Sequence, residues 1–384
     1  MSNPCWFVLL LLAAWLGHFA MMVASHNWFY AKPFPRLVGD LVQLFHVILG
    51  FLGLGWVFQG VWILSFHQGN SWPDSLAETY SLLAILTALI GVPWFESKRW
   101  RLKHSVSINK LETEKKHWPS SWAGEKMAWR LPGNQSLFLE IRTIELPVEN
   151  LPLWLHGLEI LHFSDTHFGG NDKRSYFENL FNEASKRTPD FIFFTGDLVD
   201  APEYLSWVVP LLGRLRARRG KFAIRGNHDF WNLPEEVAKS LRRAGFCCLG
   251  NGQVELDFGN GNMGSLLGNE RPWNNQVNQV EAAGNSQFTI LLAHTPDQAV
   301  LAANQGVNLA FCGHVHGGQV RIPFIGPLLL PSIHGRLFDH GFYKIAKLIM
   351  HVSRGIAGGF PYRFNCLPEI AWVRLVEGKK GTNP

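Results

Sequence analysis

Three long stretches without a charged side chain occupy the first quarter of the chain. They cover residues 6–24, 41–66 and 80–95. A helix needs about 20 apolar residues to cross the hydrocarbon of a bilayer, so the first two stretches are long enough and the third is short. A soluble helical bundle would need polar faces at helical spacing, and these stretches have almost none. The pattern therefore predicts a transmembrane region of about three helices over residues 1–97.

The first apolar stretch has two interpretations. A cleaved signal peptide begins with positive charge and ends at a pair of small residues. Residues 1–5 carry no positive charge, and no clear cleavage site of this kind follows the apolar run. We therefore expect the stretch to be retained as a membrane helix.

The loops between the stretches predict an orientation, because Lys and Arg collect on the cytoplasmic side. Lys32 and Arg36 follow the first stretch, whereas Asp74 and Glu78 follow the second without any Lys or Arg. Four basic residues then lie within residues 98–103. This alternation predicts an inner-membrane protein with its N-terminus outside and its long C-terminal part in the cytoplasm. If the third stretch only lay in the interface, the C-terminal part would be on the other side.

Residues 98–135 are rich in Lys, Arg and Trp. Basic side chains pair with anionic lipid head groups, and Trp settles where the bilayer meets water. We therefore expect a juxtamembrane connector here. A solvated linker with incidental aromatic residues is the alternative.

From residue 136 onward the hydrophobic pattern changes to that of a folded α/β domain. Residues 137–146 alternate apolar and polar side chains, as a half-buried strand does. Further strands are predicted over 158–163, 191–194, 221–224, 288–292 and 309–311, and helices over 174–186, 204–218 and 235–244. Strands and helices in this order predict an α/β domain over residues 136–384.

Composition adds three constraints. Of the 384 residues, 47% are hydrophobic and 16 are Trp, and a mean hydropathy of +0.02 is high for a wholly soluble enzyme. The net charge of +5 is too small and too dispersed to favour a nucleic-acid partner. The five cysteines follow neither a disulfide nor a zinc pattern, so reduced thiols in a cytosolic setting are expected. No feature of the sequence points to an obligate protein partner.

Candidate metal ligands follow five of the predicted strands at the point where each strand ends. They are Asp165, His167, Asp197, Asn227, His294, His314 and His316. Ligands gather at the carboxyl ends of strands in α/β sheets, and residues two apart in extended chain point to the same face. Each fragment alone is typical of a turn or a structural histidine. Together they supply enough donors for two divalent ions of a borderline kind, such as Mn, Fe, Zn or Co.

The order of these fragments resembles a known family. Asp-x-His, Gly-Asp, Gly-Asn-His, a lone His and Gly-His-x-His form the motif set of the calcineurin-like metallophosphoesterases, and all five blocks are present. Over residues 137–376 the chain is also similar to a bacterial branch with N-terminal membrane segments. This similarity is carried by residues 161–167, 193–200, 313–319, 352–355 and 363–369. The resemblance implies a four-layer α/β/β/α sandwich, with two mixed sheets between helical layers.

The resemblance also implies a role for each candidate ligand. One ion would be held by Asp165, His167 and His316. The second ion would be held by Asn227, His294 and His314, and both would be bridged by Asp197.

Two neighbouring positions complete the implied site. His228 would be catalytic, because the matching histidine of the family stabilises the phosphate or protonates the leaving oxygen. Asp229 would orient His228 or pack nearby. Residues 267–270 depart from the bacterial branch, which often has an Asp-containing turn there, so no substrate role is implied for this loop.

The expected activity is hydrolysis of a phosphodiester or phosphoanhydride bond by a metal-activated hydroxide. A phosphoenzyme is not expected, because the sequence offers no obvious nucleophile for one. An alternative of another class is a non-catalytic membrane sensor that binds a phosphorylated ligand. The presence of every ligand and of His228 disfavours this alternative.

The sequence is compatible with more than one class of substrate. Residues 322–331 follow the last ligands and are apolar, with two Gly/Pro turns. They are typical either of a packed surface loop or of an acyl-binding lip that faces the bilayer. In the second case membrane lipid is a partner, and a lipid-linked phosphoester is the substrate. Some relatives cleave UDP-2,3-diacylglucosamine in lipid A synthesis, so this pyrophosphatase activity is the alternative to a general phosphodiesterase.

Overall fold

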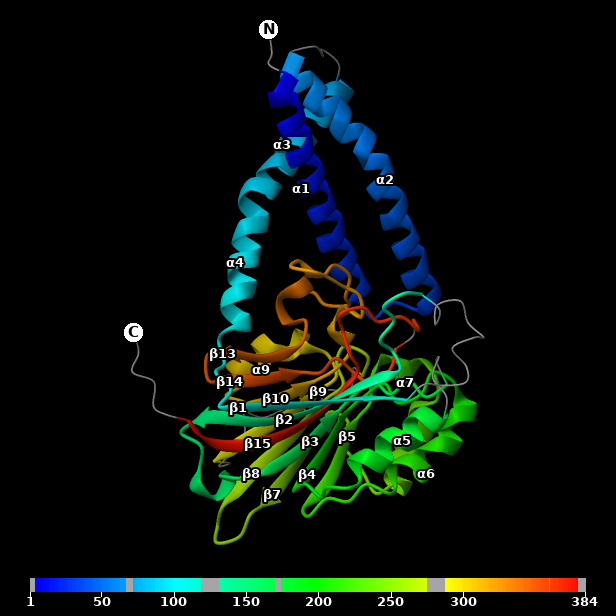
Figure 1. The fold of residues 1–384 in the computed structure, drawn as a ribbon, viewed down its shortest axis with the longest axis vertical. Helices are drawn as coiled ribbons and strands as arrows, with labels where there is room; N and C mark the ends of the chain where they lie inside the picture. Colours follow the sequence, from blue (N-terminus) through cyan, green and yellow to red (C-terminus); the bar gives the residue numbers. More distant parts are fainter. Residues whose placement is uncertain are drawn as a thin grey trace. The chain divides into compact units, whose positions relative to one another are not determined.

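The computed structural model describes residues 4–66, 72–118, 131–169, 174–274, 287–358 and 360–378 (Figure 1). The chain divides into two compact units. The first contains Met1–Leu102 and Leu329–Leu337, and the second contains Lys103–Leu328 and Phe338–Pro384. The short segment at 329–337 therefore belongs with the N-terminal helices, although it lies far along the sequence.

The described part of the first unit contains three helices that are long and apolar enough to cross a membrane: Cys5–Tyr30, Leu37–Phe66 and Trp72–Lys103. They correspond to helix α1 (Pro4–Tyr30), helix α2 (Arg36–Phe66), and a continuous run of α3 (Trp72–Leu86), a π-helical turn (Thr87–Gly91) and α4 (Val92–Lys103). The third is longer than the stretch predicted over residues 80–95, because the helix continues into charged sequence at both ends. Membrane anchoring follows from these three helices.

Small residues bring the membrane helices close together. A Cβ atom on Gly17 would lie 1.7 Å from the carbonyl oxygen of Ala84, and one on Gly60 would lie 2.1 Å from that of Ala77. The buried ring of His18 lies between helices, where its Nδ1 is 2.7 Å from the hydroxyl of Tyr80. Close backbone approach and interhelical hydrogen bonds are the usual stabilising contacts of helices in lipid.

The second unit is built on two large mixed sheets (Figure 1). One sheet has the order β1 (Lys110–His117), β2 (Phe138–Glu149), β15 (Glu369–Gly378), β3 (Glu159–Phe163), β4 (Phe191–Thr195), β5 (Gly220–Ile224) and β6 (Cys247–Cys248). The other has the order β13 (Gly341–Ile345), β14 (Leu348–Val352), β10 (Leu309–Cys312), β9 (Phe288–Ala293), β8 (Met263–Asn269) and β7 (Gln253–Asp257). A small hairpin pairs β11 (Arg321–Ile322) with β12 (Gly326–Pro327).

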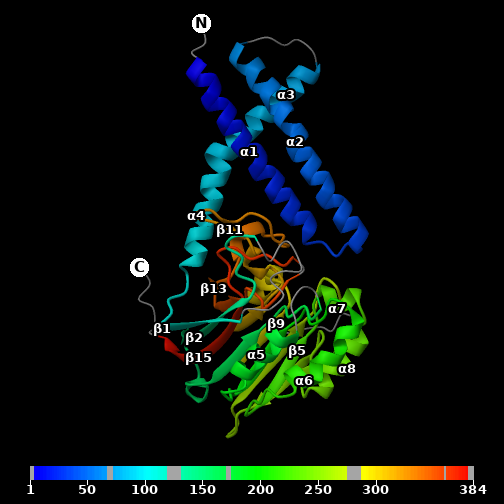
Figure 2. The ribbon, with the colours of Figure 1, turned by 45° about the vertical axis from the view of Figure 1, so that its right-hand side comes forward.

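Two apolar cores hold the layers together. The core between the sheets contains inward side chains of both, such as Phe193 and Phe311, whose rings are 5.3 Å apart. The core on the outer face of the larger sheet contains residues of α5 (Arg174–Ala184), α6 (Val208–Leu212) and α8 (Pro234–Arg243) (Figure 2). Helix α9 (Ala299–Asn304) contacts β13 and β14 of the smaller sheet. This arrangement confirms the predicted α/β/β/α sandwich.

The central strands of both sheets run parallel, so their carboxyl ends converge. Strands β3, β4 and β5 are parallel neighbours in one sheet, and β9 and β10 are parallel neighbours in the other. The two groups also contact one another across the interface between the sheets. Each of these strands ends one to three residues before a predicted ligand. The fold therefore places all the predicted ligands at one edge of the sandwich.

Parts of the segment expected to form a juxtamembrane connector, residues 98–135, lie within the described residues. Residues up to Lys103 complete α4, and Lys110–His117 form β1, which pairs antiparallel with β2. Trp118 packs against the core beneath α5. Trp122 and Trp129, two other aromatic residues of this segment, lie outside the described residues. The five cysteines are all free thiols in the structure.

Candidate metal centre

Five of the predicted ligands have a left-handed backbone. The φ angles are 55° at Asp165, 41° at His167, 58° at Asp197, 69° at His314 and 51° at His316. Such a conformation costs a non-glycine residue roughly 1–3 kcal/mol and persists only when the surrounding structure enforces it. These five residues follow β3, β4 and β10, so all three of these ligand-bearing loops contain strained backbone.

The seven predicted ligands form two groups that share one residue. The nitrogen and carboxylate atoms of Asp165, His167, Asp197 and His316 lie within 4.8 Å of one another, and so do those of Asp197, His294 and His314. The amide oxygen of Asn227 lies 3.1 Å from Nε2 of His294, beside the second group. All are buried except the His316 side chain, which is 15% exposed. The structure therefore brings the seven side chains together around Asp197.

Hydrogen bonds on the outer ring nitrogens fix the tautomers of the first group. Nδ1 of His316 lies 3.0 Å from the carbonyl oxygen of Ala357, and Nδ1 of His167 lies 2.7 Å from Oδ1 of Asp200. A carbonyl and an ionised carboxylate can only accept, so both rings carry their proton on Nδ1. The Nε2 atoms of His167 and His316 then face each other at 3.3 Å, and each offers a lone pair when it carries no second proton. Two such acceptors at this distance fit a cation between them.

The second group shows the same pattern. Nδ1 of His294 donates to the carbonyl oxygen of Thr195 at 2.6 Å, which leaves Nε2 as an acceptor. That atom faces two further acceptors, Oδ2 of Asp197 at 3.2 Å and the amide oxygen of Asn227 at 3.1 Å. An imidazole nitrogen together with carboxylate and amide oxygens is the ligand set of a borderline divalent metal, which would take the place of a second proton on Nε2. The residues present therefore fit a metal ion in each group.

The carboxylates of the centre attract positive charge. Burial on its own lowers the pKa of His167, but the charges of Asp200, Asp197 and Asp165 outweigh it and raise this pKa to about 10. Burial is likewise outweighed at His294, chiefly by Asp197, and its pKa rises to about 9. Either protons or metal ions can supply the missing charge. Metal binding in this cluster should accordingly release protons.

Asp200 is a candidate site residue that the sequence pattern did not single out. Its Oδ1 atom lies 2.7 Å from Nδ1 of His228 as well as 2.7 Å from Nδ1 of His167. A short parallel bridge between Phe168 and Val199 aligns the loops after β3 and β4 and so brings these side chains together. Asp200 lies within the motif at residues 193–200, which was the one available signal. This carboxylate orients both a candidate ligand and the candidate catalytic histidine.

Asp229, rather than orienting His228, organises the backbone of the site. Its carboxylate accepts hydrogen bonds from the backbone N–H groups of Asp197, Leu198 and Gly226, each at 2.9 Å. Burial, followed by the nearby charge of Asp197, raises the pKa of Asp229 to about 6. The orientation of His228 comes from Asp200 instead. Asp229 fixes the loop that carries the shared ligand Asp197.

Two tryptophans lie beside the cluster. The ring of Trp231 is 4.8 Å from that of His228, and Trp231 is 45% exposed. The ring of Trp273 is 4.9 Å from that of His314 and 5.4 Å from that of His294. Trp273 belongs to the loop after residues 267–270, where Glu270 accepts hydrogen bonds from Arg225 at 2.9–3.0 Å. The loop that differs from the bacterial branch thus contributes the Glu270–Arg225 ion pair, and it is followed by Trp273, whose ring lies beside the second ligand group.

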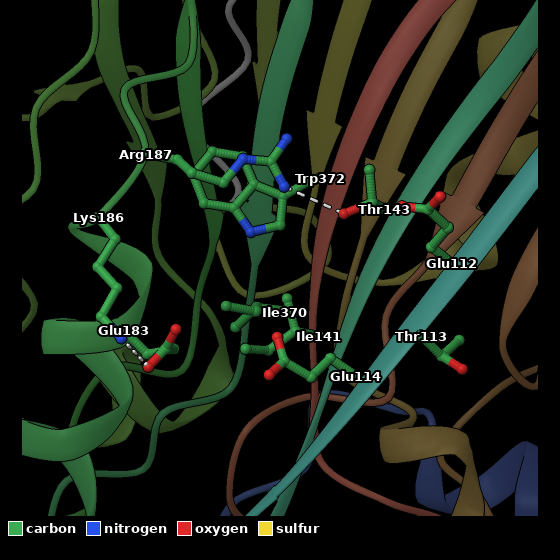
Figure 3. A pocket seen from close by; sticks show the side chains of 10 residues that line it. All are labelled: Glu112, Thr113, Glu114, Ile141, Thr143, Glu183, Lys186, Arg187, Ile370 and Trp372. Carbon is green, nitrogen blue, oxygen red and sulfur yellow. Dashed lines mark hydrogen bonds and ion pairs between the residues drawn. The ribbon is translucent and has the colours of Figure 1, made fainter.

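A separate pocket of about 330 Å³ contains none of the candidate ligands (Figure 3). It is lined by Glu112, Thr113, Glu114, Ile141, Thr143, Glu183, Lys186, Arg187, Ile370 and Trp372. The guanidinium of Arg187 lies 4.2 Å from the ring centre of Trp372 and donates to Thr143 Oγ1 at 3.1 Å (Figure 3). This pocket is formed by β1, β2, β15 and α5, so it depends on the edge strand β1 rather than on the ligand loops.

Comparison with known proteins gives consistent relatives. The family model for calcineurin-like phosphoesterases matches residues 158–318. An uncharacterized metallophosphoesterase of Bacillus subtilis, YkuE, is 34% identical over 257 residues, which cover 63% of this chain and 87% of that protein. The phosphodiesterase YaeI of Escherichia coli is 27% identical over 223 residues, which cover 57% of this chain and 82% of that protein.

A relative from Danio rerio combines the same domain with membrane segments. It is a transmembrane protein with metallophosphoesterase domain, and it is 28% identical over 250 residues. The match covers 60% of this chain and 56% of that protein, so the present chain spans about half of its length. Two mixed sheets with flanking helices and a buried His/Asp cluster at their common edge define a metal-dependent phosphoesterase. The chain belongs to the calcineurin-like phosphoesterase family.

Proposed function

We propose that this protein is a membrane-anchored phosphoesterase that uses two divalent ions to hydrolyse a phosphodiester or phosphoanhydride bond. The observation that carries the proposal is the pair of buried His/Asp clusters that share Asp197. A single structural ion would need only three or four of these groups. The relative YaeI of Escherichia coli is a phosphodiesterase, which supports the choice of a diester.

We assign the ligands by the two clusters. The first ion would be held by Asp165, His167 and His316. The second ion would be held by Asn227, His294 and His314, and Asp197 would be shared by both. Manganese, iron, zinc and cobalt all accept this mixture of carboxylate, imidazole and amide donors.

The bound ions would supply Lewis acidity that polarises the phosphoryl group and lowers the pKa of a water. His228 supplies the proton chemistry. Its Nδ1 is bonded to Asp200 at 2.7 Å, so Nε2 is on the opposite side of the ring. The side chain is 28% exposed, unlike the buried ligands, and is therefore accessible to a substrate. When the ring carries a proton on both nitrogens, Nδ1–H donates to Asp200, and Nε2–H can donate a hydrogen bond to a phosphoryl oxygen or pass its proton to the leaving oxygen.

The membrane helices and the charge pattern of their loops support placement of the catalytic domain in the cytoplasm. The presence of His228 and Asp200 beside a full ligand set favours turnover over a binding-only sensor. A sensor would need the clusters but not a proton donor held by a carboxylate. Under this proposal the anchored enzyme lies next to membrane lipid. A lipid-linked phosphoester is therefore among the substrates that the enzyme could hydrolyse.

The test compares two variants of the full-length protein purified in detergent with Mn²⁺. Asp197→Ala should lose both metal and hydrolysis of bis-p-nitrophenyl phosphate, because both ions share this ligand. His228→Ala should keep its metal and lose roughly 10²- to 10⁴-fold in turnover, as loss of a general acid does. His156→Ala, at an exposed histidine outside the cluster, is the control and should change neither. Full activity in either test variant would overturn the assignment.

A further inference from the structure

The hairpin of β11 and β12, with its flanking residues 320–328, exposes apolar side chains to an unusual degree. Phe324, between the two strands, is fully exposed, and Ile325 is 48% exposed. Val320 and Ile322 are 40% and 38% exposed. Phe324 also has φ +67°, a left-handed conformation that is strained for a bulky residue. The hairpin thus projects an aromatic side chain that the described residues of its own unit leave uncovered.

The base of this hairpin is held by polar contacts, one of which leads to the end of a membrane helix. Arg321 donates to the carbonyl oxygen of Gly317 at 2.8 Å and to Oδ2 of Asp339 at 2.9 Å. The buried carboxylate of Asp339 also binds Nζ of Lys103 at 3.1 Å. Lys103 is the last residue of the third candidate membrane span, Trp72–Lys103. A single carboxylate therefore connects the hairpin to the point where that span ends.

The chain that leaves the hairpin is held by the membrane helices themselves. Residues 329–337 belong to the helical unit. There the N–H of Leu330 donates to the side chain of Asn27 at 3.0 Å, and Arg99 donates to the carbonyl oxygen of Arg336 at 3.2 Å. Asn27 is near the end of the first span, and Arg99 is near the end of the third. Successive spans alternate in direction, so these two ends are at the same membrane surface.

We propose that the 320–328 hairpin inserts its tip, Phe324 and Ile325, into the bilayer, and that the substrate is a phosphoester anchored in that bilayer by a lipid chain. Exposed aromatic and aliphatic side chains at a membrane surface gain free energy by entering the interface. The hairpin begins four residues after the candidate ligand His316, a distance that extended chain covers in at most about 14 Å. Its base also returns to Gly317 through Arg321. A lipid phosphate at the level of the hairpin base, with the tip inserted below it, would therefore be near the metal centre.

This inference rests on the proposed function, because it names the substrate class of the same site. A lipid bilayer is chosen as the occupant because the chain carries its own membrane spans and tethers the hairpin on both sides to their ends. A second copy of the chain could also cover an exposed Phe. The test separates these two occupants.

Insertion is measured directly with a fluorophore at position 324. Phe324→Cys is made in a Cys5→Ser, Cys247→Ser background, labelled with a nitrobenzoxadiazole dye, and reconstituted in vesicles of phosphatidylethanolamine and phosphatidylglycerol with doxyl-labelled lipid. Strong quenching is expected at 324. Leu153→Cys, at a residue that is 80% exposed in the same unit, is the matched control and should be quenched severalfold less. Equal quenching at both positions, or quenching that depends on protein density rather than on doxyl lipid, would overturn insertion.

Substrate class is measured as the ratio of two turnovers. Wild-type protein in vesicles is given bis-p-nitrophenyl phosphate as a soluble diester, and phosphatidylglycerol or UDP-2,3-diacylglucosamine as a lipid phosphoester. The double variant Phe324→Asp, Ile325→Asp should lower the lipid-to-soluble ratio by roughly tenfold or more, since both anchoring side chains are lost. Leu153→Asp should leave the ratio unchanged. Metal content shows that each variant is folded.

The outcomes separate failure of the lipid inference from failure of the proposed function. If wild type hydrolyses the soluble diester but neither lipid, or if the double variant keeps the wild-type ratio, the lipid inference fails and the proposed function stands. If wild type loaded with Mn²⁺ hydrolyses nothing and binds no metal, the proposed function fails first.

Discussion

Oδ1 of Asp200 lies 2.7 Å from Nδ1 of His228, on the side of the ring away from any substrate that Nε2 would meet. Burial on its own would raise the pKa of Asp200, but His167 and His228 hold it well below the usual carboxyl range. The residue is therefore an ionised acceptor. It holds the candidate catalytic ring in one tautomer and one orientation.

Asp200→Asn should lower turnover of bis-p-nitrophenyl phosphate roughly 10- to 100-fold, which is the usual effect of removing a carboxylate that orients an active-site histidine. The amide keeps the size of the side chain but removes its charge. The same change made in His228→Ala should cost little more, because the orienting group then has no catalytic ring to orient. If the losses of turnover in Asp200→Asn and His228→Ala multiply in the double variant, and its metal content falls, Asp200 acts through His167 instead.

The absence of a side chain at Gly226 leaves room for two of the candidate ligands. A Cβ atom at Gly226 would lie 2.2 Å from Oδ1 of Asp197 and 2.6 Å from Nε2 of His294. The φ angle of Gly226 is −107°, so alanine fits the backbone and only the contacts are at issue. Gly226→Ala should therefore displace the shared ligand and lose metal while the domain stays folded. Metal analysis and circular dichroism measure these two properties.

Gly341→Ala is the matched control for that change. No atom lies within 4 Å of a Cβ placed there, but its φ angle is +96°. This variant should lose some stability, about 1 kcal/mol or more, and keep its metal. Retention of full metal content by Gly226→Ala would show that the ligand loop relaxes easily and that the close approach is not required.

The ligand positions could be predicted because parallel strands bring their carboxyl ends to one edge. Asp165 and His294 are far apart in sequence, yet each follows a buried strand directly, and that is visible in the hydrophobic pattern. Asp200 could not be found in this way. Its partners are set by the alignment of two loops, Phe168 with Val199, and no local pattern encodes such a contact.

Three elements differ from the sequence pattern for physical reasons. The predicted helix over 204–218 is instead a 3-10 turn, Pro202–Trp207, followed by short α6, in which Pro210 occupies the first turn, where a missing N–H is tolerated. Strand β1 is almost entirely charged or polar, and it is held by its ladder with β2 at an exposed edge rather than by a buried face. The third span extends past its apolar centre because polar contacts such as Gln59 to Asp74, at 2.9 Å, accommodate the charged ends.

A buried ion pair predicts how stability depends on pH. Glu369 is fully buried and accepts hydrogen bonds from the backbone N–H of Arg354 at 3.0 Å and from its Nε at 2.6 Å. Burial alone would raise the pKa of Glu369, but Arg354 and Arg142 hold it far below its ordinary value of 4.5. Because the folded pKa is depressed, this pair stabilises the fold above about pH 4.5. The contribution is lost as the pH falls through the folded value.

Glu369→Gln should therefore lower the free energy of unfolding at pH 7 by roughly 3–5 kcal/mol, since it leaves buried arginine charge without its partner. The gap to wild type should narrow as the pH falls below about 4.5. Thermal unfolding of the full-length protein in detergent, followed over a pH series, measures both effects. Arg374→Gln breaks the ion pair with Glu159, where the Arg374 side chain is 48% exposed, and should cost less than about 1 kcal/mol. A constant gap across the pH series would contradict the role given to Glu369.

Chemical labelling of a native thiol, Cys247, tests on which side of the membrane the catalytic domain lies. Cys247 is exposed in the phosphoesterase domain, and Trp72, at the start of the third span, is 77% exposed. Three spans with Lys32 on the same side as the domain predict that Cys247 is cytoplasmic and that position 72 is outside. A membrane-impermeant maleimide should therefore label Trp72→Cys, in a Cys5→Ser, Cys247→Ser background, on intact spheroplasts. It should label Cys247, in Cys5→Ser, only after permeabilisation. Labelling of Cys247 on intact spheroplasts would place the domain outside, and the third helix would then have to lie along the membrane surface rather than cross it.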